Sequence, residues 1–407
     1  MENKKLKVGN VPPLRFPGFE GEWKSKKLGE IATFSKGKGI SKSDIEENGL
    51  TECIRYGELY TYYGEVINDI KSKTNVDTSN LVLSEVNDVI IPASGETTID
   101  IATASCVLKS GIALGGDLNI IKTENNGVFL SYYLNNKKKM EIANLAQGIS
   151  VVHLYSSQLA TLTLNFPKLE EQNRISTFLA LFDARIQTQN KIIEQLETLI
   201  KGLREKLFSQ ETRFREFKDE WKLKRLREIG ETFNGLSGKI KSRNIDKSRL
   251  LTVKLHLKGV SQNDNTNTLS LGATNYFIRK KGQFIYGKQN LFNGAFGIIP
   301  DEFDGFLSSG DVPALDINHS KINTAYLLYF LGRADFYKRL EDLATGSGSK
   351  RIHETTLLGV KIDFPTIEEQ YKIANFLLSI DGKIEIETNI LQKLERQKTY
   401  FLANLFI

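Results

Sequence analysis

The chain of 407 residues has few cysteines, few histidines and no long apolar run. Its two cysteines, Cys53 and Cys106, exclude a disulfide framework and any CxxC metal spacing, and its four histidines show no ligand-like spacing. No uncharged apolar run approaches the ~18–20 residues of a membrane-spanning helix. The first residues lack the apolar stretch of a signal peptide. We therefore expect a cytoplasmic protein without a metal site.

Catalytic motifs are also missing. The sequence contains no GxxxxGK[ST] phosphate loop and no Asn/Asp-Pro-Pro-Tyr/Phe motif of amino-methyltransferases. Pro300-Asp301 is not followed by Glu-x-Lys at the spacing of a nuclease, and His153 and His353 have no nucleophile partner. The sequence therefore predicts a protein that is not an enzyme.

What is present is a globular composition, with 40% hydrophobic and 26% charged residues. Fifty-five Lys and Arg against 49 Asp and Glu give a net charge of +6. This mild basic excess permits a nucleic-acid partner without requiring one.

An internal repeat organises the chain. Residues 166–172 (FPKLEEQ) recur at 364–370 (FPTIEEQ), and residues 15–24 (RFPGFEGEWK) recur at 213–222 (RFREFKDEWK). Both pairs of segments keep the same offset of 198 residues, and both tryptophans of the chain lie inside the second pair. Two distant motifs that hold one offset indicate a duplication.

The segments between these anchors, about residues 40–125 and 240–315, resist alignment with each other. One frame thus carries two different inserts. We expect the shared frame to do the same job twice, and the inserts to do related jobs with different specificity.

A long helix follows each Phe-Pro. Thr366 and Glu369 form a capping box at the second one. Apolar residues recur at alternating steps of three and four, which is a coiled-coil seam. The seam positions are Ile175, Leu179, Phe182, Ile186, Ile193, Leu196, Ile200, Leu203, Ile373, Leu377, Ile380, Ile384, Leu391, Leu394 and Phe401.

An ordinary amphipathic helix packed on its own domain is the alternative for each run. Each run is about 40 residues long, however, whereas most globular helices end by ~20 residues. We expect the two helices to pair as an antiparallel coiled coil that acts as a rigid spacer, with Gln189 and Glu387 as polar positions that fix its register.

Each insert mixes short strand-like runs, turn residues and one apolar helical stretch, which is typical of an α/β (mixed) domain. The predicted organisation is a flexible arm, a first α/β domain, a central helix, a second α/β domain and a C-terminal helix. Their bounds are residues 1–14, 15–167, 168–210, 211–365 and 366–407.

Basic, amide and hydroxyl residues collect in the loops of both inserts. Such side chains contact phosphates and read base edges in the major groove of DNA. Solvated surface charge is the alternative for any single one of them. The candidate DNA-binding residues are Lys36, Lys38, Ser94, Gly95, Thr97, Thr98, Gln147, Ser150 and His153 in the first copy, and Lys239, Lys241, Lys288, Gln289, Asn290, Ser347, Lys350 and Arg351 in the second.

These motifs resemble the specificity (S) subunits of type I restriction-modification systems. The likeness rests on Arg-Phe-Pro-Gly-Phe-x-Gly-x-Trp at residues 15–23, on the Gly-x-Ser loop with its Gly346-Ser-Gly counterpart, and on the Phe-Pro-x-Leu/Ile-x-Glu-Gln motif and the long helix of both copies. The second copy departs from it with Arg213-Phe-Arg-Glu-Phe.

The resemblance implies two target-recognition domains, joined by helices that form an antiparallel coiled coil, each reading one half of a bipartite, asymmetric DNA sequence. It implies two modification (methyltransferase) subunits with S-adenosylmethionine as partners, and restriction (translocase/endonuclease) subunits that use ATP and Mg. No cofactor or metal is expected in this chain.

Two other hypotheses remain. In the first, the chain is a coiled-coil scaffold whose inserts bind proteins, and any DNA binding would then lack the usual dependence on salt. In the second, it is an enzyme with an unrecognised site, and the purified chain would then methylate DNA when supplied with S-adenosylmethionine.

Overall fold

The computed structural model describes residues 9–228, 230–231, 239–240, 245–263, 275–346 and 348–407. Two compact units divide the chain: unit 1 is Met1–Lys191 with Asn389–Ile407, and unit 2 is Ile192–Thr388. Each long helix contributes one part to each unit. Among the described residues, none of the helices is both long and apolar enough to cross a bilayer.

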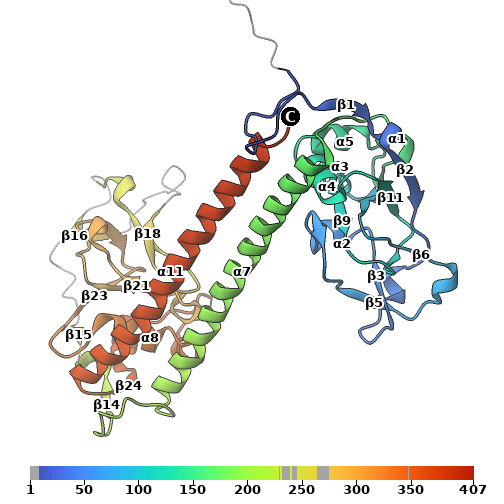
Figure 1. The fold of residues 1–407 in the computed structure, drawn as a ribbon. Helices are drawn as coiled ribbons and strands as arrows, with labels where there is room; N and C mark the ends of the chain where they lie inside the picture. Colours follow the sequence, from blue (N-terminus) through green and yellow to red (C-terminus); the bar gives the residue numbers. More distant parts are fainter. Residues whose placement is uncertain (1–8, 229, 232–238, 241–244, 264–274, 347) are drawn as a thin grey trace, which may run out of the picture. The chain divides into compact units, whose positions relative to one another are not determined.

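Unit 1 contains the first insert (Figure 1). Its strands are β1 (Lys24–Lys27), β2 (Ala32–Lys36), β3 (Thr51–Ile54), β4 (Val66–Ile67), β5 (Ser72–Thr74), β6 (Val82–Leu83), β7 (Asp88–Pro92), β8 (Ser94–Gly95), β9 (Ser105–Val107), β10 (Ala113–Leu114), β11 (Leu118–Thr123), β12 (Val152–His153) and β13 (Thr163–Phe166). Its short helices are α1 (Leu28–Ile31), α2 (Glu58–Thr61), α3 (Thr98–Ile101), α4 (Gly127–Asn136), α5 (Lys139–Leu145) and α6 (Ser156–Leu159), with 3-10 turns η1 (Lys42–Asp44) and η2 (Thr78–Asn80).

The sheets of unit 1 combine parallel and antiparallel strands. A five-stranded sheet has the order β2-β11-β7-β9-β4, and a four-stranded sheet has the order β5-β3-β10-β6. Strands β4 and β9 pair parallel, as do β3 and β10, whereas β7 and β11 pair antiparallel. The expected mixed α/β fold is confirmed for this insert.

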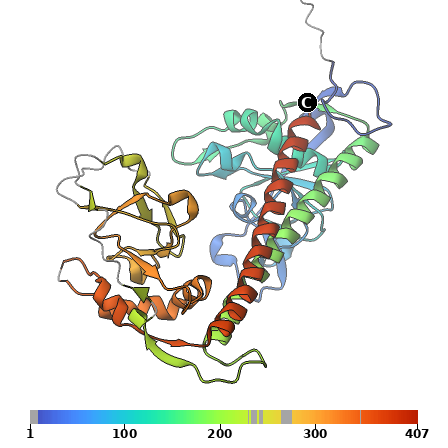
Figure 2. The ribbon, with the colours of Figure 1, turned by 90° about the vertical axis from the view of Figure 1, so that its left-hand side faces the viewer.

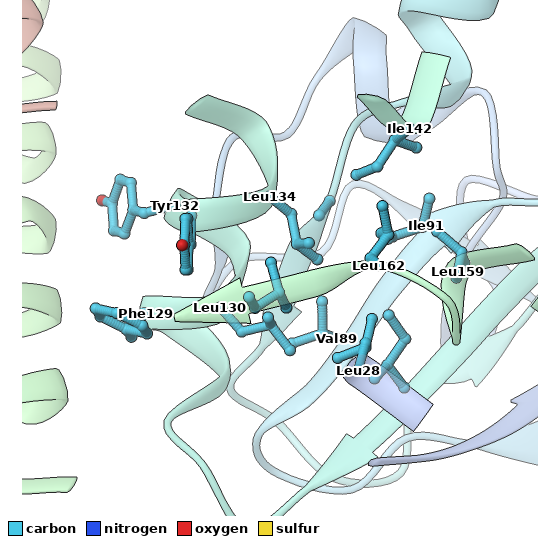
Figure 3. Close-up of a cluster of buried hydrophobic side chains, with 14 of the residues drawn as sticks. Leu28, Val89, Ile91, Phe129, Leu130, Tyr132, Leu134, Ile142, Leu159 and Leu162 are labelled. Carbon is cyan, nitrogen blue, oxygen red and sulfur yellow. The ribbon is translucent and has the colours of Figure 1, made fainter. Parts of the chain in front are cut away.

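The main core of unit 1 joins helix α4 to the five-stranded sheet. Figure 3 shows Leu130 of α4 beside Val89 of β7, within one buried cluster. Both cysteines are free and buried, and burial raises the pKa of the Cys53 thiol to about 11 and that of the Cys106 thiol to about 12. They are therefore neutral at neutral pH.

Unit 2 contains the second insert. Its strands are β14 (Lys222–Arg225), β15 (Gly230–Glu231), β16 (Lys239–Ile240), β17 (Leu251–Val253), β18 (Val260–Gln262), β19 (Tyr276–Ile278), β20 (Phe284–Tyr286), β21 (Phe296–Ile298), β22 (Leu307–Ser309), β23 (Ala314–Ile317) and β24 (Lys361–Phe364). Its short helices are α8 (Thr324–Leu331), α9 (Ala334–Arg339) and α10 (Glu354–Gly359), with 3-10 turns η3 (Leu226–Glu228), η5 (Lys247–Arg249), η6 (Leu291–Asn293), η7 (Asp301–Phe303) and η8 (Leu340–Leu343).

The sheets of unit 2 differ from those of unit 1. They are β15-β23-β20-β21, β16-β19-β22 and the pair β17-β18. The two copies nevertheless close in the same way. Strand β1 pairs with β13 so that Lys24 faces Phe166, and β14 pairs with β24 so that Lys222 faces Phe364. The frame is therefore repeated around two different inserts, as the sequence predicted.

The long helices are α7 (Leu169–Phe208) and α11 (Ile367–Asn404). Thr366 caps α11, because its Oγ1 accepts a hydrogen bond from the backbone N–H of Glu369 at 3.4 Å. None of the fifteen seam positions is exposed. The polar positions Gln189 and Glu387 are also buried.

Within unit 1, the helices meet in antiparallel fashion. The rings of Phe178 and Phe182, in the first half of α7, lie 4.9 and 5.3 Å from that of Phe401, near the end of α11. Both views place these two segments side by side (Figures 1 and 2). Lys398 adds an ion pair of 2.6 Å to Asp183, which also accepts a hydrogen bond of 2.5 Å from the Tyr132 hydroxyl.

Within unit 2, the order is the converse and therefore again antiparallel. Leu207 and Phe208, at the end of α7, share one buried cluster with Ile373 and Leu377, in the first turns of α11. The Tyr329 hydroxyl donates to Asp381 of α11, as Tyr132 does to Asp183 in unit 1.

An ion pair at the start of each long helix was not foreseen. Arg15 donates two hydrogen bonds of 2.7 Å to Glu171, and Arg213 donates bonds of 2.7 and 2.8 Å to Glu369. The hydrogen bond to Glu171 is the main cause of the raised pKa of Arg15. Each pair ties the first motif of a repeat to the first turn of its helix.

Candidate nucleic-acid interface

The first candidate surface lies where β2, β8 and β12 end. Lys36 is the last residue of β2, and its Nζ lies 5.9 Å from the centre of the Tyr155 ring. The His153 ring stacks on the same tyrosine, with centroids 6.4 Å apart at 25°. Gln147 and His153 exchange two backbone hydrogen bonds of 2.9 and 2.7 Å. The structure thus brings together three residues predicted from distant segments.

Ser94 and Gly95 lie beside this group but not in a turn. They form strand β8, which pairs with β12 so that Ser94 faces His153, and both are buried. The loop position predicted for Ser94 and Gly95 is therefore wrong, and the turn begins only after them. Thr97 caps helix α3 by accepting a hydrogen bond of 3.1 Å from the Asp100 N–H, and Thr98 is the first residue of that helix.

The two remaining candidates of the first copy are exposed. Lys38 donates its backbone N–H to Leu114 at 2.9 Å, and Ser150 lies in the loop between Gln147 and His153. Lys36 has no ion pair among the residues that the structure describes. This surface therefore presents a cation that none of the described carboxylates neutralises.

The second candidate surface has the same backbone plan. Thr345 and Arg351, the repeat equivalents of Gln147 and His153, also exchange two hydrogen bonds, each of 2.9 Å. Lys288 follows β20, and its carbonyl accepts a hydrogen bond of 2.9 Å from the Ile352 N–H. Lys288 and Arg351 are thus neighbours.

The electrostatics of the second surface are different. Three of its cations lie against carboxylates: Lys288 3.0 Å from Glu354, Lys350 2.7 Å from Glu341, and Arg351 3.4 Å from Asp311. The pairs of Lys350 and Arg351 are half-exposed, so they contribute little stability and can be exchanged for other anions.

Gln289 and Asn290 are exposed beside Lys288, and Asn290 accepts a hydrogen bond of 3.1 Å from the Asn293 side chain. Lys239 lies in β16, which pairs with β19. Lys241 and Ser347 lie outside the described residues.

Sequence reasoning missed the aromatic and acidic members of these surfaces. Tyr155 could have been predicted from the sequence, because it lies two residues after His153 and alternate residues of an extended segment share a face. The carboxylates of Asp311 and Glu354 could not have been predicted, since their pairing depends on the tertiary fold.

Comparison with known proteins identifies the family to which the chain belongs. The model of the type I restriction modification DNA specificity domain matches the chain twice, at residues 20–198 and 218–396. The chain belongs to this family. It is a specificity subunit, whose part in a type I restriction-modification system is recognition of the DNA target and not catalysis. Among the described residues, no cluster of three or more His, Cys, Asp or Glu side chains is placed to hold a metal ion.

One relative and two solved structures match this specificity subunit over more than nine tenths of its length. It is 25% identical over 401 residues to the MjaVIII type I restriction enzyme specificity subunit of Methanocaldococcus jannaschii, covering 93% of this chain and 90% of that one. Its fold is similar to the crystal structure of the S subunit from M. genitalium, with a TM-score of 0.62, 17% identity, and 98% and 99% of the two chains covered. It is also similar to a chain from a study of complex assembly and conformational transition in the type I system, with a TM-score of 0.52, 15% identity, and 96% and 98% covered.

Proposed function

We propose that each α/β domain of this specificity subunit reads one half of a bipartite, asymmetric DNA target. The observation that carries the proposal is the contrast between the two copies. The same hairpin closure, Gln147–His153 and Thr345–Arg351, is flanked in one copy by a lysine that forms no ion pair with the described residues and in the other by ion-paired cations. Equal frames with unlike surfaces suit two unlike half-sites.

In this proposal, the candidate residues named from the sequence remain the predicted DNA contacts, except Ser94 and Gly95, which are buried in β8. Lys36, Lys38, Lys350 and Arg351 carry the charge that phosphates require, and Gln147, Gln289 and Asn290 carry amides that pair with adenine edges. The half-exposed carboxylates beside Lys350 and Arg351 exchange for phosphate when DNA binds.

We further propose that the long helices hold the partner subunits. Both helices expose apolar side chains outside their seam positions, among them Leu181, Leu199, Tyr371, Leu378, Ile386 and Tyr400. The partners proposed are two modification (methyltransferase) subunits, which bind S-adenosylmethionine, and restriction subunits, which use ATP and Mg. This chain would direct their chemistry to the target.

An exchange of one domain tests the division of labour. Residues 15–167 are replaced by the corresponding domain of another family member, and methylated adenines are mapped by single-molecule sequencing in cells that carry the complete system. One half of the recognised sequence is expected to change while the other half stays. A change in both halves would contradict the assignment of one half-site to each domain.

A further inference from the structure

The loops that link Gln147 to His153 and Thr345 to Arg351 are closed by the same pair of backbone hydrogen bonds, and their sequences differ. Gly148 and Gly346 have φ of +135° and +118°, and a Cβ on either glycine would overlap the carbonyl oxygen of the residue three positions later. The same glycine and the same pair of hydrogen bonds therefore constrain both hairpin tips.

The first tip carries apolar side chains that the second lacks. Ile149 is 100% exposed and Val151 is 51% exposed. At the equivalent positions, the second copy has Ser347 and Ser349. An exposed isoleucine alone is ordinary on a protein surface. Ile149 instead lies on a constrained tip, two residues from Gln147 and two from Val151, on the surface that carries Lys36 and His153.

We propose that Ile149, supported by Val151, contacts the C5-methyl group of a thymine in the half-site read by the first domain. The inference rests on the proposed function and adds to it the chemical group of the base that the first hairpin contacts. A hairpin this narrow has the width of a two-stranded ribbon, which the major groove accepts. The thymine methyl is the apolar group that base edges present in that groove.

The polar neighbours place the tip against DNA. Lys36 and the exposed His153 both contact the Tyr155 ring and suit phosphate contacts, while the Gln147 amide suits the adenine of the same or the next base pair. Ile149 is thereby a specificity-determining residue. The second hairpin, without a branched apolar residue, reads no methyl group.

The test uses the specificity subunit in complex with its modification subunits and DNA that contains the mapped target. Each thymine of the first half-site is replaced singly by deoxyuridine, which removes only the C5-methyl group. At one position, the affinity is expected to fall about three- to fivefold, as loss of one buried methyl group predicts. Ile149→Ala should weaken binding to unmodified DNA by a similar or larger factor and should abolish the effect of deoxyuridine at that position.

Val86→Ala is the matched control. Val86 is 59% exposed and lies before the first residue of β7, whereas β8 follows the last residue of that strand. It should leave both the affinity and the deoxyuridine effect unchanged. Sequence-specific binding that is insensitive to deoxyuridine, an Ile149→Ala variant that keeps the full effect, or a first half-site without thymine would each overturn the inference alone. Absence of any sequence-specific binding would instead overturn the proposed function, and the inference with it.

Discussion

Arg15 and Arg213 show how much a single residue can do for this fold. Each guanidinium makes a two-point contact with a glutamate in the first turn of a long helix, and each also binds a backbone carbonyl of its own motif, Gly21 or Asp219. Glu171 and Glu369 are buried, so neither carboxylate has water as a substitute partner. These are the positions where loss of one side chain leaves an uncompensated charge.

Replacement of Glu171 by alanine is therefore expected to lower the free energy of unfolding of unit 1 by about 2–3 kcal/mol. This value lies at the lower limit of the range for breaking a buried ion pair, or just below it, because the Arg15 side chain retains some contact with water. The measurement is urea unfolding followed by fluorescence in a Trp221→Phe background, where Trp23 reports on unit 1 alone.

Glu170→Ala is the control for this change, since Glu170 occupies the same helical turn but is exposed. It should shift the free energy of unfolding by less than about 1 kcal/mol. Equal effects of the two substitutions would show that the carboxylate acts on the helix dipole and not through Arg15.

The candidate interface shows what single residues reveal in sequence and what they do not. Lys36, Gln147 and His153 were chosen as separate loop residues, and the hairpin brings two of them into direct contact. The partners of Lys350 and Arg351 could not be predicted, because Glu341 lies in η8, Asp311 lies in a turn after β22, and no periodicity links them to the two cations.

At the scale of elements, the last residue of α7 and a residue just after α11 occupy equivalent aromatic pockets. Phe406 lies 5.3 and 5.5 Å from the rings of Phe129 and Tyr133 in unit 1. Phe208 lies 5.3 and 5.5 Å from the corresponding Tyr326 and Phe330 in unit 2. Each helix thus begins in one unit and ends in the core of the other.

Phe406→Ala is expected to destabilise unit 1 by about 3–5 kcal/mol, the usual effect of removing a buried phenylalanine ring. Phe208→Ala should destabilise unit 2 by a comparable amount because its pocket is equivalent. Each effect is measured in the background whose remaining tryptophan lies in the unit concerned.

Tyr400→Ala provides the comparison, because this aromatic residue of α11 is exposed and should contribute less than about 1 kcal/mol. A small effect of Phe406→Ala, within that of Tyr400→Ala, would mean that the helix end is not part of the core.

The long helices were the most predictable elements. Their seam follows from a periodicity that extends over the whole run, and all fifteen seam residues are at least half-buried or lie in the core. The packing of Phe208 and Phe406 into their pockets was harder to predict from the sequence, because the contacts join residues far apart in the chain. A signal did exist, because the Leu-Phe pairs 207–208 and 405–406 keep the repeat offset of 198 residues.

At the scale of the whole molecule, unit 1 is discontinuous in sequence. Its core contains Leu405 and Phe406 together with residues of the first insert, and the N–H of Leu14 donates to the carbonyl of Asn404 at 2.9 Å. The predicted first domain, residues 15–167, is thus completed by a segment from the far end of the chain.

This arrangement predicts complementation. A fragment of residues 1–191 should unfold more readily than unit 1 of the intact chain, and a peptide of residues 389–407 should restore stability in a concentration-dependent way, as expected for a ligand that binds only the folded state. Thermal unfolding with increasing peptide measures the effect. The same peptide with Phe406→Ala should give little stabilisation, whereas equal effects of the two peptides would argue against a specific pocket.

The same discontinuity affects how unit 1 folds during synthesis. When residue 191 leaves the ribosome, the aromatic pocket of Phe129 and Tyr133 has no occupant, and Phe406 follows only after more than 200 further residues. At ~5–20 residues per second, this delay lasts on the order of 10–40 s. During that interval, the nascent first domain exposes apolar surface, which makes it a natural client for chaperones.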